Sequence, residues 1–309
     1  MDSSRRDFLG TTAAGVSALS LAGRLSAKAA RPAGSRVLGA NDRVQFGVIG
    51  VGGMGFGHVR QLVRRSQDPA DVQVMAVSDI YTRRKKRAQD HATLAGRDVH
   101  HDYRDLLARS DIDAVVIATP DHWHARHALD ALQAGKDVYL QKPMTYTIEE
   151  ARDIAQAVER TRRVLQVGSQ HTSDLRYHRA QEVIQKGWIG ALLWAQGTYS
   201  RNSLYGEWNY RIDDEGTEQN IDWKAFLGSA PKRAFSQDRY FRWRKYWDYS
   251  GGIATDLLYH KLAPLLLALG PRFPVRVTAQ GGIYVHQDRE VPDTYTPTVE
   301  FEPFYVVMS

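Results

Sequence analysis

Three polar side chains are of the types needed for acid–base chemistry. Asp256 and His260 lie four positions apart in a segment predicted to be helical, so they should share one helix face. A histidine, with a pKa near ~6.5, suits proton transfer at neutral pH, and a neighbouring carboxylate can orient it. Lys142 precedes Pro143, which favours an extended backbone and directs an ammonium that can stabilise charge developing on oxygen. Alternatively, the Asp–His pair is a surface feature and Lys-Pro is an ordinary turn.

A glycine-rich loop indicates a nucleotide site. It reads Gly50-Val51-Gly52-Gly53-Met54-Gly55, between a predicted strand over 44–49 and a predicted helix over 57–65. Gly50 permits a tight turn, Gly52 lets the backbone approach a pyrophosphate, and Gly55 permits close packing of helix and strand. The N–H groups at the start of the helix then face the phosphates, together with the backbone of Gly53 and Met54. A glycine turn without a ligand is the alternative.

Asp79 predicts which nicotinamide cofactor the loop binds. It ends the predicted strand over 72–78, where a carboxylate accepts hydrogen bonds from the adenosine ribose hydroxyls. A carboxylate there repels a 2′-phosphate, which favours NAD over NADP. Arg83 and Arg84 follow closely enough to keep NADP open, and Asp79 alternatively only starts a turn.

Further candidates follow the next predicted strand, over 114–118. Thr119, Pro120 and His124 lie at its carboxyl end, the edge where parallel sheets bind ligands, so we expect them to contact the cofactor or cap a helix. His122 and His127 are close by, but no acidic or sulfur ligand joins these histidines in a recognised spacing, so no metal is expected.

Two arginines and several aromatic residues complete the candidates. Arg242 and Arg244 precede Gly251-Gly252 and are candidate cofactor or substrate contacts. Four aromatic side chains are candidates for stacking on sugar faces, although packing within a sheet also explains such residues. They are Trp208, Trp243, Trp247 and Tyr249.

The elements that position these residues change in type along the chain. Strands and helices alternate over 43–168, with further strands at 137–140 and 164–167, which predicts a doubly wound parallel sheet in an α/β domain. The helix after 147 should bury Ile148, Ala151, Ile154, Ala155 and Val158. Residues 169–309 predict a separate α+β domain. Its expected helices are 175–186 and 255–269, and its expected strands are 191–200, 275–280, 283–286 and 298–302.

Composition excludes several classes of protein. The chain of 309 residues suits two domains, with 43% hydrophobic and 25% charged residues. It contains no cysteine, which excludes disulfides, thiolate nucleophiles and cysteine-ligated metals. The basic run over 83–87 is typical of a solvated helix face, and no nucleic-acid partner is expected.

The N-terminus resembles an export signal. Ser4-Arg5-Arg6-Asp7-Phe8-Leu9-Gly10 precedes an uncharged stretch over 11–22 and the small-residue pattern Ala27-Lys28-Ala29. We therefore predict a twin-arginine signal peptide over 1–29, a linker over 30–42, and a periplasmic or otherwise extracytoplasmic protein exported by the twin-arginine translocase. The apolar stretch is shorter than the ~20 residues of a membrane span, so the mature form should have none. An exported protein of this kind should carry its cofactor without releasing it. At the other end, 305–309 resembles the middle of a strand, so we expect the chain to be truncated.

Together these motifs resemble the Gfo/Idh/MocA family of glucose–fructose oxidoreductase and inositol dehydrogenase. The matching residues are Gly50–Gly55, Asp79, Ala118-Thr119-Pro120 with His124, Gly135-Lys136, Lys142-Pro143, and Gly251-Gly252 with Asp256 and His260.

The resemblance implies a Rossmann domain followed by a domain with a large open, mainly antiparallel sheet that often builds homo-oligomers. It implies that Lys142 contacts nicotinamide ribose and substrate and that His260 is the general acid/base. Gln141, at the cofactor, replaces the usual glutamate, and 261–264 lacks an aspartate often found beyond the histidine.

The function implied is that of an exported NAD(P)-dependent oxidoreductase. It would transfer hydride between a tightly held nicotinamide cofactor and a secondary hydroxyl of a sugar, glycoside or polyol. One alternative is an NAD-dependent glycoside hydrolase that acts by transient oxidation and elimination. A non-catalytic or inactive fragment is the other.

Overall fold

The computed structural model describes residues 43–68, 71–201, 203–270 and 272–309, which belong to one compact unit. The predicted signal peptide over 1–29 and linker over 30–42 lie outside these residues. Within the described part of the chain, no helix has the length and apolar character required to cross a membrane.

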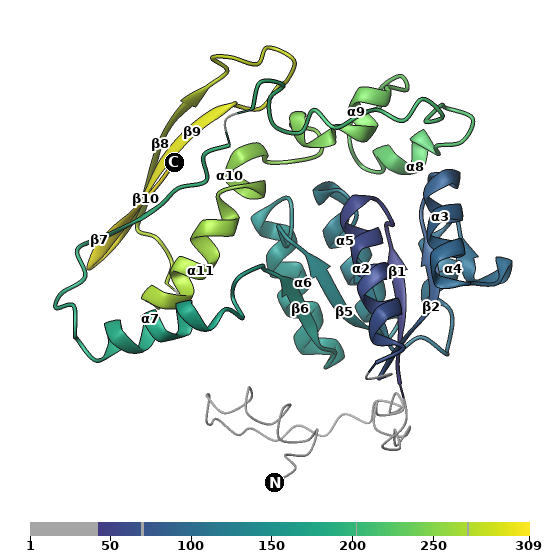
Figure 1. Cartoon of the computed structure of the whole chain (residues 1–309), viewed down its shortest axis with the longest axis horizontal. Helices are drawn as coiled ribbons and strands as arrows, with labels where there is room; N and C mark the ends of the chain where they lie inside the picture. Colours follow the sequence, from purple (N-terminus) through teal and green to yellow (C-terminus); the bar gives the residue numbers. More distant parts are fainter. Residues whose placement is uncertain (1–42, 69–70, 202, 271) are drawn as a thin grey trace, which may run out of the picture. The chain divides into compact units, whose positions relative to one another are not determined.

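The first half of the described chain is built on a six-stranded parallel sheet (Figure 1). Its order is β3-β2-β1-β4-β5-β6, the arrangement of a doubly wound dinucleotide-binding fold. The strands are β1 (Val44–Ile49), β2 (Val72–Ser78), β3 (Val99–His100), β4 (Ala114–Ile117), β5 (Asp137–Gln141) and β6 (Leu165–Gly168). The helices between them are α2 (Gly53–Arg65), α3 (Thr82–Ala92), the short 3₁₀ helix η1 (Gly96–Asp98), α4 (Tyr103–Leu107), α5 (Asp121–Gln133) and α6 (Ile148–Thr161).

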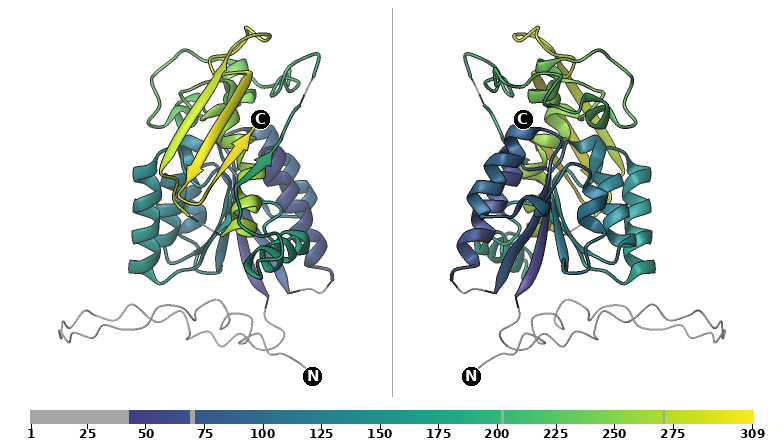
Figure 2. Two further views of the ribbon diagram at one scale, coloured as in Figure 1. Left: turned by 90° about the vertical axis from the view of Figure 1, so that its left-hand side faces the viewer. Right: turned by 90° about the vertical axis from the view of Figure 1, so that its right-hand side faces the viewer.

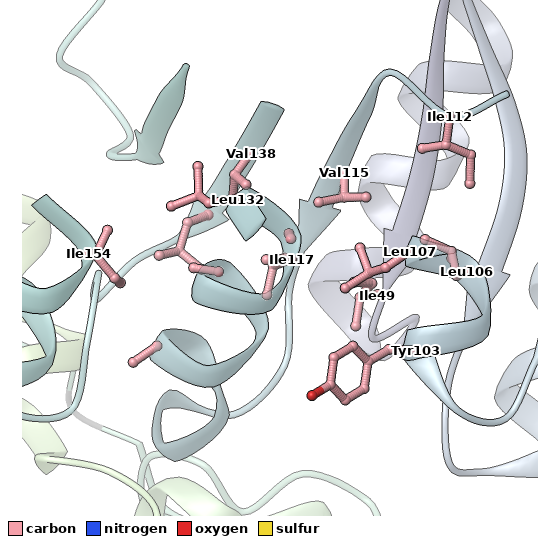
Figure 3. Packing of buried hydrophobic residues seen from close by; sticks show 14 of the residues in the cluster. Ile49, Tyr103, Leu106, Leu107, Ile112, Val115, Ile117, Leu132, Val138 and Ile154 are labelled. Carbon is pink, nitrogen blue, oxygen red and sulfur yellow. The ribbon is translucent and has the colours of Figure 1, made fainter. Parts of the chain in front are cut away.

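Each face of this sheet is covered by helices because both faces of its central strands are apolar. Side chains alternate along β1, so Val48 packs under α2 and α3 while Ile49 packs under α4 and α5. Figure 3 shows the second cluster, where Ile117 and Val138 of the sheet meet Leu132 of α5. This two-sided core fixes the carboxyl ends of β1, β4 and β5, from which the predicted site residues extend.

The second half is a smaller α+β domain. Its four strands have the order β7-β10-β9-β8, in which β10 pairs antiparallel with β9 and parallel with β7 (Figure 2). Helix α11 packs its leucines against Val299, Phe301 and Val306 of this sheet. The elements are α7 (Leu175–Gln185), β7 (Trp194–Gly197), α8 (Trp223–Leu227), α9 (Gln237–Phe241), η2 (Trp243–Lys245), α10 (Gly252–Asp256), α11 (Tyr259–Leu269), β8 (Arg276–Gly282), β9 (Thr294–Phe301) and β10 (Phe304–Met308). The predicted fold class, a Rossmann sheet followed by an open and mainly antiparallel sheet, is confirmed.

The expected helix over 255–269 is interrupted, and this changes the site. Helix α10 ends at Asp256 and α11 begins at Tyr259. The backbone carbonyl of Asp256 accepts a hydrogen bond from Lys142 Nζ at 2.9 Å, and the N–H of His260 donates to Leu257 O instead. The prediction that one helix carries both Asp256 and His260 is therefore wrong.

Two smaller predictions are also wrong. Residues 283–286 form no strand because the N–H groups of Tyr284, Val285 and His286 donate to the carboxylate of Asp293 rather than to a neighbouring strand. In α6, the buried residues are Ile154 and Ala157, whereas Ile148 and Ala155 are exposed.

Candidate functional site

The carboxyl ends of β1, β2, β4 and β5 open into one cavity of about 1080 Å³. This is near the upper end of the roughly 300–1,000 Å³ typical of small-molecule sites. Most of the predicted site residues line it. They are Gly50, Gly52, Gly53, Met54, Asp79, Thr119, Pro120, Gln141, Lys142, Arg244, Asp256 and His260.

The glycine loop fits a dinucleotide because side chains are excluded where the fold needs close approach. Gly50 has φ +81°, and a Cβ there would lie 2.7 Å from Thr119 Cγ2. A Cβ on Gly55 would lie 1.8 Å from Gly50 O, so the start of α2 closes on the loop only with glycine at this position. Gly52 faces the cavity. The roles predicted for the loop glycines agree with this geometry, and these residues would hold the pyrophosphate of NAD.

Asp79 ties the end of β2 to this loop. It is 7% exposed, and its carboxylate accepts hydrogen bonds from the N–H of Val51 at 2.8 Å and of Tyr81 at 2.9 Å. The two arginines that follow Asp79 diverge. Arg83 forms an ion pair with Asp213 away from the cavity, whereas Arg84 lines it.

Helix α5 begins at Asp121 and contains His124, which does not line the cavity. His124 is 1% exposed, with Nδ1 2.7 Å from Pro143 O and Nε2 2.8 Å from Thr119 O. Burial lowers its pKa to about 4. His124 therefore lies between the end of β4 and the Lys-Pro turn, and it does not line the cavity where its contact with the cofactor was expected.

Lys142, Asp256 and Arg244 form a buried charge cluster at the cavity. Lys142 Nζ lies 2.6 Å from Asp256 Oδ1, and Arg244 Nε lies 3.1 Å from the same oxygen. Burial by itself would raise the pKa of Asp256, but Arg244 and Lys142 outweigh it and hold that pKa well below its usual range. Gln141, at the place of the expected glutamate, is uncharged, and its Nε2 lies 2.7 Å from His58 Nε2 of α2. The charge of Lys142 is therefore balanced by Asp256 and not by residue 141.

His260 lines the same cavity from the start of α11. Burial lowers its pKa to about 4, and the nearby Lys142 ammonium adds to this shift. The imidazole is therefore neutral at pH 7 and can accept a proton. Because Asp256 directs its carboxylate to Lys142, Arg244 and Trp208, the expectation that Asp256 orients His260 is wrong.

Asp121 lines the cavity, although it was not among the site residues predicted from the sequence motifs. It is 2% exposed, and burial raises the pKa of its carboxyl to about 7, against the opposing effect of Arg244. Its Oδ2 has no hydrogen-bond partner among the described residues. Its place directly after Thr119-Pro120, at the end of a strand, was the signal available in the sequence.

The second domain contributes cavity residues for which the sequence held no motif. Arg201, Glu207, Tyr210 and Arg211 line the cavity from an irregular segment, and Arg201 pairs with Glu207 at 2.7 Å. Arg242 donates to the backbone of Tyr210 at 2.8 Å and thus supports that segment.

The aromatic residues divide into buried and accessible ones. Trp208 and Tyr249 are 2% and 0% exposed, so the expectation that they stack on a sugar is wrong. Trp243 lines the cavity, with the Arg244 guanidinium 4.1 Å from its ring centroid. Trp247 is 46% exposed.

Among the described residues, no group of three or more histidines, aspartates or glutamates is placed to hold a metal ion.

Comparison with known proteins identifies matching families for both halves of the chain. Residues 44–169 match the Gfo/Idh/MocA family model for an NAD-binding Rossmann fold of oxidoreductases. Residues 193–294 match the model for the C-terminal alpha/beta domain of the same family.

Curated relatives are identical to this chain at about a third of the aligned positions. A protein of Shewanella baltica named glycosyl hydrolase family 109 protein is 33% identical over an alignment of 218 positions, which covers 63% of this chain and 45% of the relative. An alpha-N-acetylgalactosaminidase of Shewanella oneidensis is 31% identical over the same extent, again 63% and 45%. The chain thus spans about half the length of the curated relatives it matches.

Solved structures share the fold. The WlbA dehydrogenase from Bordetella pertussis, solved with NADH and UDP-GlcNAcA, superposes with a TM-score of 0.65 at 19% identity, covering 86% of this chain and 71% of that one. GenD2 from gentamicin A biosynthesis, solved with NAD, gives 0.66 at 21% identity, covering 94% and 69%.

Proposed function

This chain belongs to the Gfo/Idh/MocA oxidoreductase family, and we propose that it uses NAD to oxidise a secondary hydroxyl of a sugar, glycoside or polyol. The observation that carries the proposal is that the glycine loop lines the same cavity as Lys142, Asp256 and His260. NAD, when bound, supplies the acceptor for the hydride.

The chain's own residues then handle the proton and the developing charge. The neutral imidazole of His260 accepts the hydroxyl proton of the substrate. The Lys142 ammonium stabilises the alkoxide as it forms, and Asp256 keeps that ammonium in place. Arg244 shares Asp256 with Lys142, so the cluster carries two cations for one carboxylate, an arrangement that favours an oxyanion nearby.

Two observations support a carbohydrate as the substrate. The second domain contributes Glu207, Tyr210 and Arg201 to the cavity lining, and these side chains can exchange hydrogen bonds with several hydroxyl groups. The curated relatives carry the names of enzymes that act on glycosides.

These names also favour a second candidate, the cleavage of a glycosidic bond. In that reaction a ring hydroxyl would be oxidised to a ketone, the leaving group eliminated and water added in its place. The same hydride would then reduce the ketone again, so that no net redox change remains. The same residues serve both reactions, because both begin with loss of the hydroxyl proton to His260.

A substrate panel separates the two candidates. The purified chain is incubated with free sugars and with nitrophenyl glycosides, in the presence and absence of an external hydride acceptor. Release of nitrophenol without an acceptor supports cleavage, whereas persistent sugar-dependent reduction of the nicotinamide supports dehydrogenation. Lys142→Met should abolish either activity, and Lys86→Met, at an exposed side chain of α3, should leave it unchanged. Absence of both activities across the panel, in protein that binds NAD, contradicts the proposal.

We also propose that the chain is exported with NAD already bound, since residues 1–29 match a twin-arginine signal. Replacement of Arg5 and Arg6 by lysine should retain the protein in the cytoplasm. Export of that variant at the normal level would contradict this part of the proposal.

A further inference from the structure

Trp208 is a buried residue that the proposed chemistry leaves without a role. Its side chain is almost fully enclosed, and its indole Nε1–H donates a hydrogen bond to Asp256 Oδ2 at 3.0 Å. A buried indole N–H normally finds a hydrogen-bond partner. In this protein the partner is the carboxylate that also holds Lys142.

The two oxygens of Asp256 have different partners. Oδ1 faces the Lys142 ammonium at 2.6 Å, while Oδ2 receives the indole of Trp208. Donors on opposite oxygens fix the rotation of the carboxylate about its Cβ–Cγ bond. Lys142 Nζ also donates to the backbone oxygen of Asp256 at 2.9 Å. The position of the ammonium therefore depends on the orientation of Asp256.

The backbone at Trp208 adopts a conformation that bulky residues rarely show. Its φ is +66°, in the left-handed region. Such a conformation persists only where the surrounding structure holds it in place, and it is frequent at functional sites. Leu257 and Val291 enclose the indole, while the neighbouring Glu207 and Tyr210 reach the cavity wall.

From this arrangement we infer that Trp208 is a positioning residue that sets the Lys142 ammonium through Asp256. Trp208 also anchors the segment over 203–211 to the charge cluster. This segment brings Glu207 and Tyr210 to the cavity. The inference rests on the proposed function, because Lys142 contacts the substrate only in that reaction.

The first test compares two matched tryptophans. Trp208→Phe removes the N–H and keeps an aromatic ring, and Trp223→Phe does the same at another buried indole, which donates to Arg233 O at 2.7 Å away from the charge cluster. We expect Trp208→Phe to lower kcat by about tenfold or more with KM nearly unchanged, because small misplacements of a catalytic group are costly. Trp223→Phe should leave kcat nearly unchanged. A kcat for Trp208→Phe equal to that of Trp223→Phe, or a change in KM alone, overturns the inference.

The second test does not depend on activity. Urea unfolding midpoints are measured for both tryptophan variants in the wild-type and Asp256→Ala backgrounds. Should Asp256→Ala not fold, Asp256→Leu replaces it, since leucine also cannot accept a hydrogen bond from the indole. If the indole acts through Asp256, the shift caused by Trp208→Phe shrinks in the second background, whereas the shift caused by Trp223→Phe stays the same. Equal shifts for Trp208→Phe in both backgrounds overturn the inference. Wild-type protein without turnover contradicts the proposed function instead, and this unfolding cycle still decides the coupling of Trp208 to Asp256.

Discussion

The ammonium of Lys142 lies 2.6 Å from Asp256 Oδ1 and 2.9 Å from the backbone oxygen of the same residue, across 114 positions of sequence. Lys142 follows β5 of the parallel sheet, and Asp256 ends α10 of the second domain. This contact joins the two halves of the site and interrupts the helix that would otherwise run from Asp256 to His260.

The Lys142–Asp256 ion pair should stabilise the folded protein as well as take part in the proposed reaction. Asp256→Asn leaves Lys142 and Arg244 without their buried counter-charge, and breaking a buried pair in this way costs about 3–5 kcal/mol of the free energy of unfolding. Urea denaturation measures the loss. Asp90→Asn, which breaks the exposed pair with Lys86, is the control and should leave the midpoint almost unchanged. Equal effects of the two substitutions would contradict the importance assigned to the buried pair.

The lowered pKa of His260 predicts the pH dependence of turnover. A general base must be neutral, and with a pKa of about 4 His260 stays neutral as the pH falls from 8 to about 5. We therefore expect kcat/KM to show no acid limb from His260 near pH 6.5. Asp121 titrates in the same range, so the profile is recorded in the Asp121→Asn background as well. A limb near pH 6.5 that survives there and disappears in His260→Gln would contradict this assignment.

Two glycines of α2 should differ sharply in their effect on NAD binding. Gly55→Ala places a methyl group 1.8 Å from Gly50 O, so the loop must open and NAD affinity should fall by at least tenfold. A Cβ on Gly57 meets nothing within 4 Å, and Gly57→Ala should keep the affinity and slightly stabilise the helix. Calorimetric titration with NAD compares the two variants. Unchanged affinity in Gly55→Ala would rule out the loop as the nucleotide site.

Buried titratable groups predict that acid destabilises the fold before the carboxylates are protonated. Burial lowers the pKa of His122 and His124 to about 4 and that of His127 further, so the unfolded chain takes up protons below pH 6.5 that the native protein does not. Asp121 acts in the opposite direction, because its raised pKa of about 7 lets the native protein bind a proton first. The net difference from these four groups is about two protons, so they should lower stability by about 3 kcal/mol per pH unit between pH 6 and 5. The lowered pKa of His260 acts in the same direction as that of the three histidines.

Denaturant unfolding at several pH values measures this slope. Asp121→Asn removes the opposing group, so its slope should be steeper than that of the wild type by about one proton. A free energy of unfolding that is constant between pH 7 and 5 would contradict the burial of the three histidines as neutral groups.

The sequence predicted the parts of the site that depend on local structure. Alternating strands and helices determine that Gly50, Asp79 and Lys142 follow parallel strands, and such strands end at one edge. The glycine loop could be recognised because its conformational needs leave few other residue types possible.

The remaining features depend on contacts between distant residues, which no local pattern encodes. Lys142 donates to the carbonyl of Asp256 only where the two domains pack together, so no local sequence pattern indicated the break in the predicted helix over 255–269. In the same way, Trp208 was indistinguishable from the accessible aromatics, because its burial is created by Leu257 and Val291. The pKa shifts of Asp121 and His260 likewise arise from burial in the assembled cavity.

We propose above all that the cavity at Gly50–Gly55 holds NAD beside Lys142 and His260. The most direct test is to denature the purified chain, assay the released nucleotide, and titrate the nucleotide-free protein with NAD. We expect NAD in the released fraction or one molecule of added NAD bound per chain, and we expect this binding to be lost in Gly55→Ala and retained in Gly57→Ala. Protein that is folded, releases no nucleotide and binds no added NAD would contradict it.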